Sequence, residues 1–503
     1  MAGKMSARQW PARRIVGPAL GSPLLQLGGL AVLNAAVYLL VFVRPWGLVS
    51  LASQPLLDLR DLSAGDPLVR WRLLASFGLL GLSYWRGWCA ARQTQGRTGW
   101  LLVLASAATS GAILLFLYPF GAADLFDNVM HGRILAVYGE NPFARPAMDF
   151  LADPFYPYVG WRRFPTAYGP GWELMAAATV RLAGDGLLAS ALAFKALGGL
   201  FLAGCIAIVA LLLRRTAPER ALAGTLLLAW NPIVLYETLG QGHNDAAMVF
   251  WILACAGFLA WRRYTLALLA LVAGALVKFV PLLLLPAAAL IALRSLTGSR
   301  ARLRFVALTA CAAVLLVLLA YAPFWRGSET LAIEHRRALF TTSLPAVAGV
   351  LLEEPLGRER AGSVVSLAAA GITACFALWQ GVRASRNPSW RSFVQAAFLI
   401  LIFYLLFTCL WFQQWYAIWP LGLVPLLPAH LAWLGVSIGF AVLAKPLIAE
   451  PLWMWPRPTP SRVWQQLRQG PAVLALPWLL AAVALLWGRG TRSLEGGSER
   501  GPD

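Results

Sequence analysis

The feature that most constrains this chain is a succession of long apolar runs separated by short, arginine-rich segments. The first run, residues 23–43, would rise about 31 Å as a helix, enough to cross the hydrocarbon core of a bilayer. Hydrophobic residues make up 59% of the 503 residues and charged residues only 13%. This composition excludes a soluble or a disordered chain. We predict a polytopic integral membrane protein of the all-α class.

The later apolar runs extend this pattern along most of the chain. They lie near 73–90, 100–119, 187–213, 221–239, 244–261, 264–293, 303–323, 362–382, 393–412, 415–428, 431–448 and 471–487. Because the run 264–293 is long enough for two short passes, we expect about 12–14 transmembrane helices in one domain, residues 23–488. A basic segment, 1–22, precedes this domain. A tail rich in Gly, Ser and charge, 489–503, follows it, and we expect both ends to be cytoplasmic and the tail disordered.

The net charge of +20 arises mostly from cations that lie between the apolar runs. This placement is typical of cytoplasmic loops rather than of nucleic-acid binding. The arginine clusters fall on one side of the membrane if 264–293 passes twice. With that side in the cytoplasm, two long segments lie outside, 120–171 and 324–361. The six cysteines form no CxxC pair, so neither a disulfide framework nor a zinc site is expected.

The outer segment 120–171 combines acids, cations and aromatic residues, which suggests a site for a polar ligand. Its stretch 124–138 fits a helix in which Asp124, Asn128 and His131 share one face, with Asp127 beside His131. Two carboxylates and an imidazole so placed could have separated pKa values and supply a base. Alternatively, Asp124 caps the helix and Asp127 offsets the helix dipole. We expect no cofactor, although a divalent metal held by these residues stays an open alternative.

Three other polar groups lie at outer ends of apolar runs. The residues 241–245 could cap a helix or line a cavity that holds sugar hydroxyls. Lys278 could bind a phosphate or reach to the interface as a snorkelling side chain. Arg336 and Arg337 suit an anionic head group. The aromatic turn 411–416 could equally belong to an interfacial belt.

Together these pieces resemble the GT-C superfamily of polytopic glycosyltransferases, and most closely bacterial polyprenyl-phosphate-mannose-dependent α-mannosyltransferases. The stretches that carry the resemblance are 124–143, 153–154, 168–172, 242–248, 278–281, 321–324 and 415–420. The resemblance implies a fold of about a dozen helices, a lipid-phosphate sugar donor and an acidic base in the first large outer loop. This chain departs from many GT-C enzymes because that loop follows the third predicted span rather than the first.

We therefore expect a glycosyltransferase in the bacterial cytoplasmic membrane that moves a hexose, with mannose favoured, from a polyprenyl monophosphate. A lipid-linked or glycan acceptor would receive it on the extracytoplasmic face, with inversion, because one base acts in one step. Asp124 and Asp127 are the candidate bases, and the resemblance favours Asp124. The candidates for the donor phosphate are Lys278, Arg337, Arg336 and His243. The candidates for the sugar or acceptor are His131, Arg133, Asn141, Tyr168, Asn244, Asp245, Gln413, Trp415 and Tyr416.

Two other classes of protein remain as alternatives. A multi-span transporter or glycolipid flippase would place polar residues near the bilayer midplane and carry inverted repeats. In this chain the polar groups gather at one face. A membrane acyltransferase would use His131 beside an acid.

Overall fold

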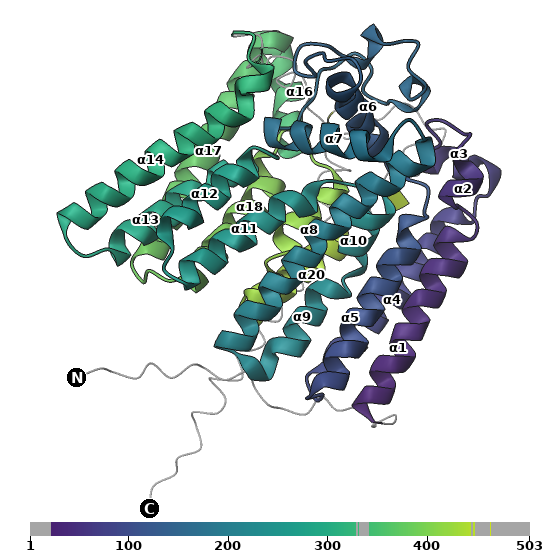
Figure 1. The fold of residues 1–503 in the computed structure, drawn as a ribbon, viewed down its shortest axis with the longest axis horizontal. Coiled ribbons are helices and arrows are strands. Elements are labelled where there is room, and N and C mark those ends of the chain that lie inside the picture. The colour runs from purple at the N-terminus through teal and green to yellow at the C-terminus, as the bar shows by residue number, and fades with distance from the viewer. Residues whose placement is uncertain (1–21, 328–329, 331–341, 444–445, 448–462, 464–503) are drawn as a thin grey trace, which may run out of the picture.

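The computed structural model describes residues 22–327, 330, 342–443, 446–447 and 463. Within these residues the regular structure is helical, apart from isolated bridge residues such as the pair Gly47 and Leu117. The long helices pack side by side (Figure 1), and aliphatic and aromatic side chains fill the space between them. The structure confirms the predicted class, an all-α polytopic membrane protein.

Among the described residues, six helices are long and apolar enough to cross a membrane. They are Pro23–Val43 (α1 and its π-helical end), Arg97–Leu115 (α5), Leu187–Thr216 (α8), Ser299–Phe324 (α14 and a 3₁₀ turn), Arg358–Ser385 (α17) and Trp390–Thr408 (α18 and its π-helical end). A bent pair forms a further candidate, Pro218–Ala229 (with α9, Ala221–Ala229) and Pro232–Gly240 (with α10, Pro232–Leu235). The helix axis bends by 45° between the two halves. Pro232 at the bend lacks the amide hydrogen that a continuous helix needs.

Shorter apolar helices and one less apolar long helix complete the bundle. They are Val69–Ala91 (α4), Asp245–Ala260 (α11), Tyr264–Ala275 (α12), Val280–Ser295 (a 3₁₀ turn and α13) and Ala429–Val442 (α20). The predicted run 264–293 is indeed divided in two, with Lys278 at the break. The predicted span 415–428 was wrong: it consists of short turns and the one-turn helix Ile418–Leu421 (α19), because Pro420 and Pro425 interrupt it. The predicted span 471–487 lies outside the described residues.

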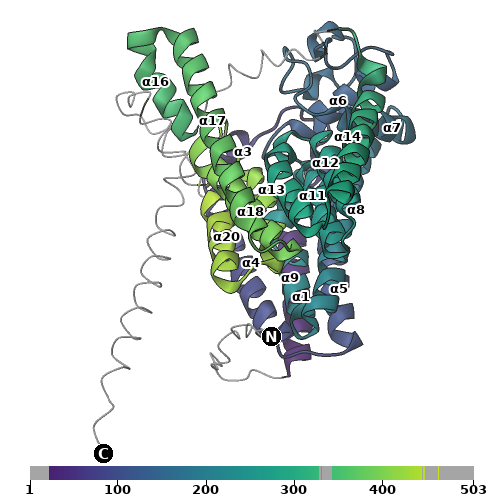
Figure 2. The same ribbon diagram turned by 90° about the vertical axis from the view of Figure 1, so that its left-hand side faces the viewer.

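The two ends of the bundle differ in content. Figure 1 shows α6 (Asp124–Ala136), α7 (Pro170–Ala183) and α16 (Leu344–Leu356) at the same end of the bundle, which also carries α2 (Leu48–Leu51) and α3 (Leu59–Gly65). The arginine-rich turns between α4 and α5, α8 and α9, and α11 and α12 lie at the other end. In Figure 2 the helices α17, α18 and α20 lie on one side of the molecule and α6, α7 and α14 on the other. Three long helices, α1, α4 and α5, precede α6, as the sequence predicted.

Two glycines allow the close approaches that bring distant segments to the site. A Cβ atom on Gly169 would overlap the carbonyl oxygen of Leu276, so only glycine fits between this loop and the break before Lys278. The amide of Gly169 donates to the carbonyl of Val277 at 2.9 Å. Gly242 has a φ of +80°, which favours glycine, and packs against Leu125 in α6. These contacts hold three parts of the chain together around the start of α6.

Candidate active site

Asp124 is the first residue of α6, and its carboxylate faces two side chains from elsewhere in the chain. Its Oδ2 lies 3.6 Å from Nδ1 of His243 and 3.5 Å from the hydroxyl of Tyr168. The helix cap is Ala123, which makes no side-chain hydrogen bond, so the capping alternative for Asp124 was wrong. Burial alone would raise the pKa of Asp124. The hydrogen bond and charge of His243, with the charge of Lys278, outweigh burial and lower this pKa.

Asp127 lies one turn further along α6, and its pKa is shifted in the opposite direction from that of Asp124. Its side chain is buried, and Oδ1 accepts hydrogen bonds from the backbone amides of Gly160 and Trp161, each at 3.0 Å. Burial, and then the charge of Asp124, raises the pKa of Asp127 to about 8. Asp127 is therefore largely protonated at neutral pH. The two carboxyl groups have separated pKa values, and Asp124 is the one that is ionised.

His243 stands between two acids. Nδ1 faces Asp124, and Nε2 lies 3.4 Å from Oε2 of Glu237. The imidazole stacks on Trp415, with ring centroids 4.1 Å apart. Burial lowers the pKa of His243, but the hydrogen bonds and charges of Asp124 and Glu237 outweigh it and raise the value to about 9. His243 is therefore a cation at neutral pH, which makes it a phosphate partner rather than a base.

Lys278 supplies a second cation on another side of Asp124. Its Nζ lies 2.7 Å from Oδ1 of Asp245 and within 5.3 Å and 5.6 Å of the ring centroids of Tyr168 and Tyr416. The indole of Trp419 also donates to Oδ1 of Asp245. Only 12% of the Lys278 side chain is exposed, so the ammonium belongs to this cluster and does not snorkel. Segments from α6, α11 and the break between α12 and α13 thus bring two acids and two cations together.

A comparison with protein families shows what this chain is related to. The family model described as alpha-(1->6)-mannopyranosyltransferase, N-terminal domain, matches residues 27–294. The chain belongs to this family. It is thus a mannosyltransferase, which decides against the transporter and acyltransferase alternatives. No curated protein and no solved structure matches the chain.

The matched region of the mannosyltransferase contains most of the cluster, including Asp124, His243 and Lys278. Trp415 and Tyr416 lie beyond it, in the turn that covers His243 and Lys278. Asn244 is also buried, and neither atom of its side-chain amide has a hydrogen-bond partner among the described residues. Its amide does not cap α11, although Asn244 occupies the capping position.

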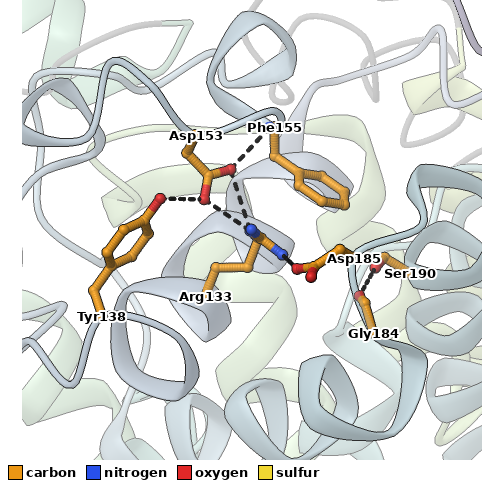
Figure 3. Close-up of polar contacts among 7 residues, drawn as sticks. All are labelled: Arg133, Tyr138, Asp153, Phe155, Gly184, Asp185 and Ser190. Carbon is orange, nitrogen blue, oxygen red and sulfur yellow. Dashed lines mark hydrogen bonds and ion pairs between the residues drawn. The ribbon is translucent and has the colours of Figure 1, made fainter.

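Arg133 lies in a separate cluster of the mannosyltransferase (Figure 3). Its Nε donates to Asp153 at 2.9 Å, and its Nη1 lies 2.6 Å from Asp185. The hydroxyl of Tyr138 donates to the same Asp153 carboxylate, and the Arg133 guanidinium stacks over Phe155. These contacts tie α6 to the outer loop and to the end of α7. The Arg133 side chain therefore binds these partners and makes no contact with Asp124 within the described structure.

The other predicted residues differ in their surroundings. His131 is buried, and burial lowers its pKa to about 4 against the charge of Asp124, so its imidazole is neutral. Asn141 donates to the carbonyl of Phe324 at 2.7 Å, which joins the outer loop to the end of α14. Gln413 is half-buried next to Trp415. Arg336 and Arg337 lie outside the described residues.

Sequence reasoning missed two charged residues that the structure places at this site. Glu237 is 1% exposed and holds His243. Lys195 in α8 is 0% exposed, and its Nζ donates to the carbonyls of Leu117 and Gly240. These hydrogen bonds join the segment that precedes α6 to the segment that precedes His243. Both residues lie inside apolar runs, where a charge is costly and therefore points to a function; the same signal had identified Lys278.

Proposed function

We propose that this mannosyltransferase transfers mannose from a polyprenyl-monophosphate donor to a lipid-linked or glycan acceptor, with Asp124 as the general base. The observation that carries the proposal is the ionised Asp124 carboxylate beside two cations, His243 and Lys278. A carboxylate can accept a proton, and cations can stabilise a departing phosphate. The same chain has helices long and apolar enough to cross a bilayer, a setting that suits a donor with an isoprenoid tail.

The donor phosphate would bind between Lys278 and His243. Each cation now faces carboxylates, Asp245 for Lys278 and Asp124 with Glu237 for His243. A bound phosphate would therefore share these cations with the carboxylates that already contact them. Because the phosphate gains charge as the glycosidic bond breaks, the two cations stabilise the transition state more than the ground state. Arg336 and Arg337 remain further candidates from the sequence.

The transfer would proceed in a single displacement. The acceptor hydroxyl oxygen attacks the anomeric carbon, and the bond from that carbon to the phosphate oxygen breaks. The electron pair leaves with the phosphate, and the hydroxyl proton passes to Asp124. Its contacts with His243 and Tyr168 are both made by Oδ2, which leaves Oδ1 for the acceptor hydroxyl. Attack opposite the leaving group inverts the anomeric centre.

Asp127 would act as a neutral partner in this reaction. Its protonated carboxyl group adds no second negative charge next to Asp124, and its backbone contacts fix α6 against the loop at 160–161.

The proposed orientation of the protein in the membrane rests on the arginine-rich turns. With these turns in the cytoplasm, the site opens on the extracytoplasmic face.

The donor class can be tested with the purified full-length protein in lipid nanodiscs. We would supply radiolabelled mannose either on a polyprenyl monophosphate or on a nucleoside diphosphate, with octyl α-(1→6)-dimannoside as acceptor. We expect labelled trimannoside only from the lipid donor, and we expect an α-mannosidase to release the label if a β-linked donor is inverted. Labelled product from the nucleotide donor alone would overturn the proposed donor class.

A further inference from the structure

A cavity of about 170 Å³ lies beside the active site. It is lined by α3 and the residue before it, the first half of α4, residues 120–121, the π-helix Tyr236–Gly240, the turn 413–415 and residues that follow α20. Glu237 and Trp415 line it, and both also contact His243. The imidazole of His243 therefore connects this cavity to Asp124. Lys278 is not among the lining residues, so the cavity is distinct from the side where we place the donor phosphate.

The polar wall of the cavity suits a neutral ligand with several hydroxyl groups. Its groups are the carboxylates of Asp58 and Glu237, the guanidinium of Arg60 and the side-chain amides of Gln413 and Gln414. The acids Asp58 and Glu237 are matched by Arg60 and by the His243 cation that faces Glu237, so this wall has no excess of positive charge to attract a phosphate. Carboxylates and amides together accept and donate hydrogen bonds, as sugar hydroxyls require.

The apolar part of the wall and the volume of the cavity limit the class and size of ligand that it can hold. The indole of Trp415 offers a flat apolar surface for the carbon face of a sugar, and other apolar side chains continue this wall. Pockets for drug-sized ligands measure about 300–1,000 Å³, so this cavity suits one ring rather than a long glycan or an isoprenoid chain. Glu237 closes this wall on the side of His243, with its Oε2 3.4 Å from Nε2 of that imidazole.

We propose that this cavity is an acceptor subsite that binds one neutral hexose ring of the acceptor saccharide. Asp124 does not line the cavity, so the bound ring would be a neighbour of the ring whose hydroxyl reacts. The acceptor would then approach Asp124 from the side of Glu237 and Trp415, and the donor from the side of Lys278. This proposal rests on the proposed function, because it presumes a saccharide acceptor.

Equilibrium binding of radiolabelled octyl α-(1→6)-dimannoside to the full-length protein in nanodiscs tests the subsite without any donor. The variants are Gln413→Ala and Arg60→Ala, and the matched control is Gln93→Ala, an exposed glutamine in the turn between α4 and α5. Loss of one neutral hydrogen bond should weaken binding about three- to tenfold in Gln413→Ala, and loss of one from a charged group about tenfold or more in Arg60→Ala. The control should bind as the unaltered protein does. In transfer assays the KM for the lipid donor should stay unchanged in all three.

The outcomes separate the subsite from the proposed function. Weaker dimannoside binding in both variants, with an unchanged donor KM, supports the subsite. Unaltered dimannoside binding in both variants overturns it, as does a raised donor KM without weaker acceptor binding. If the unaltered protein binds dimannoside through these residues but transfers no mannose from the lipid donor, the subsite stands and the proposed donor is wrong.

Discussion

At the scale of single residues, the site depends on which groups carry charge at neutral pH. Asp124 is ionised, Asp127 is largely protonated and His243 is a cation, although all three are closely packed. Sequence spacing placed Asp124 and Asp127 near His131 but could not separate their roles, because each pKa depends on contacts from distant segments. His243 comes from the start of α11, and the amides that bind Asp127 come from residues 160–161.

We expect Glu237→Gln to lower the pKa of His243 from about 9 toward its ordinary value near 6.5. The raised pKa means that charged His243 stabilises the fold fully below pH 6.5 and that this contribution is lost as the pH rises through about 9. In the variant the loss should begin at lower pH, and the alkaline limb of the activity profile should move with it. Protein labelled with ¹⁵N-histidine suits the measurement because the chain has only 4 histidines.

The matched control for this variant is Glu219→Gln, an exposed acid in the turn between α8 and α9. It should leave the His243 titration unchanged. An identical His243 titration in Glu237→Gln and in the unaltered protein would show that Glu237 does not set this charge. The folded state of each variant can be followed by its melting temperature.

At the scale of elements, apolar periodicity and run length predicted much of the structure. The helix predicted over 124–138 appears as Asp124–Ala136, and the division of 264–293 and the three long helices before the outer loop also appear in the structure. The run 415–428 was misjudged because its hydropathy resembles a span while its prolines prevent a continuous helix. Lys195 and Glu237 were missed because they are single charges in runs dominated by apolar residues. Only the packing shows that Lys195 joins the ends of two helices.

The loop at Gly169 offers a test of how elements position the site. Gly169→Ala would force a Cβ atom toward the carbonyl of Leu276 and separate Tyr168 from Lys278. Overpacking of this kind typically costs about 1–3 kcal/mol, so we expect a lower melting temperature together with a lower kcat. Gly28→Ala is the control, since a methyl group at this position on α1 would have no neighbouring atom within 4 Å. Equal activity in the two variants would show that this close approach does not position the site.

At the scale of the whole molecule, the arrangement separates a basic end from an end that carries the site. The family match covers residues 27–294, and the later helices and the turn 413–419 complete the surroundings of His243 and Lys278. The sequence predicted this difference between the two ends, because clustered cations are typical of the cytoplasmic ends of membrane spans. It could not predict which later segment would fold over the site, because that depends on contacts between residues more than a hundred positions apart.

Membrane orientation can be measured in intact cells with single cysteines at Arg145 and Arg97. Arg145 lies in the loop after α6, and Arg97 begins α5 at the basic end. We expect an impermeant maleimide to label Arg145→Cys and to leave Arg97→Cys unlabelled until the cells are permeabilised. The unaltered protein gives the background from its own cysteines. The reverse pattern would place the site in the cytoplasm and contradict the proposed orientation.

The most direct test of the central claim compares the turnover of Asp124→Asn and Asp127→Asn under saturating lipid donor and acceptor at pH 7. Asparagine matches aspartate in size but cannot accept the proton, so Asp124→Asn should lose about 10²–10⁴-fold in kcat. Asp127 is already largely protonated, and an asparagine can accept the same two amide hydrogen bonds, so Asp127→Asn should keep most of its turnover. Near-normal turnover in Asp124→Asn with an inactive Asp127→Asn would contradict the account and make Asp127 the base.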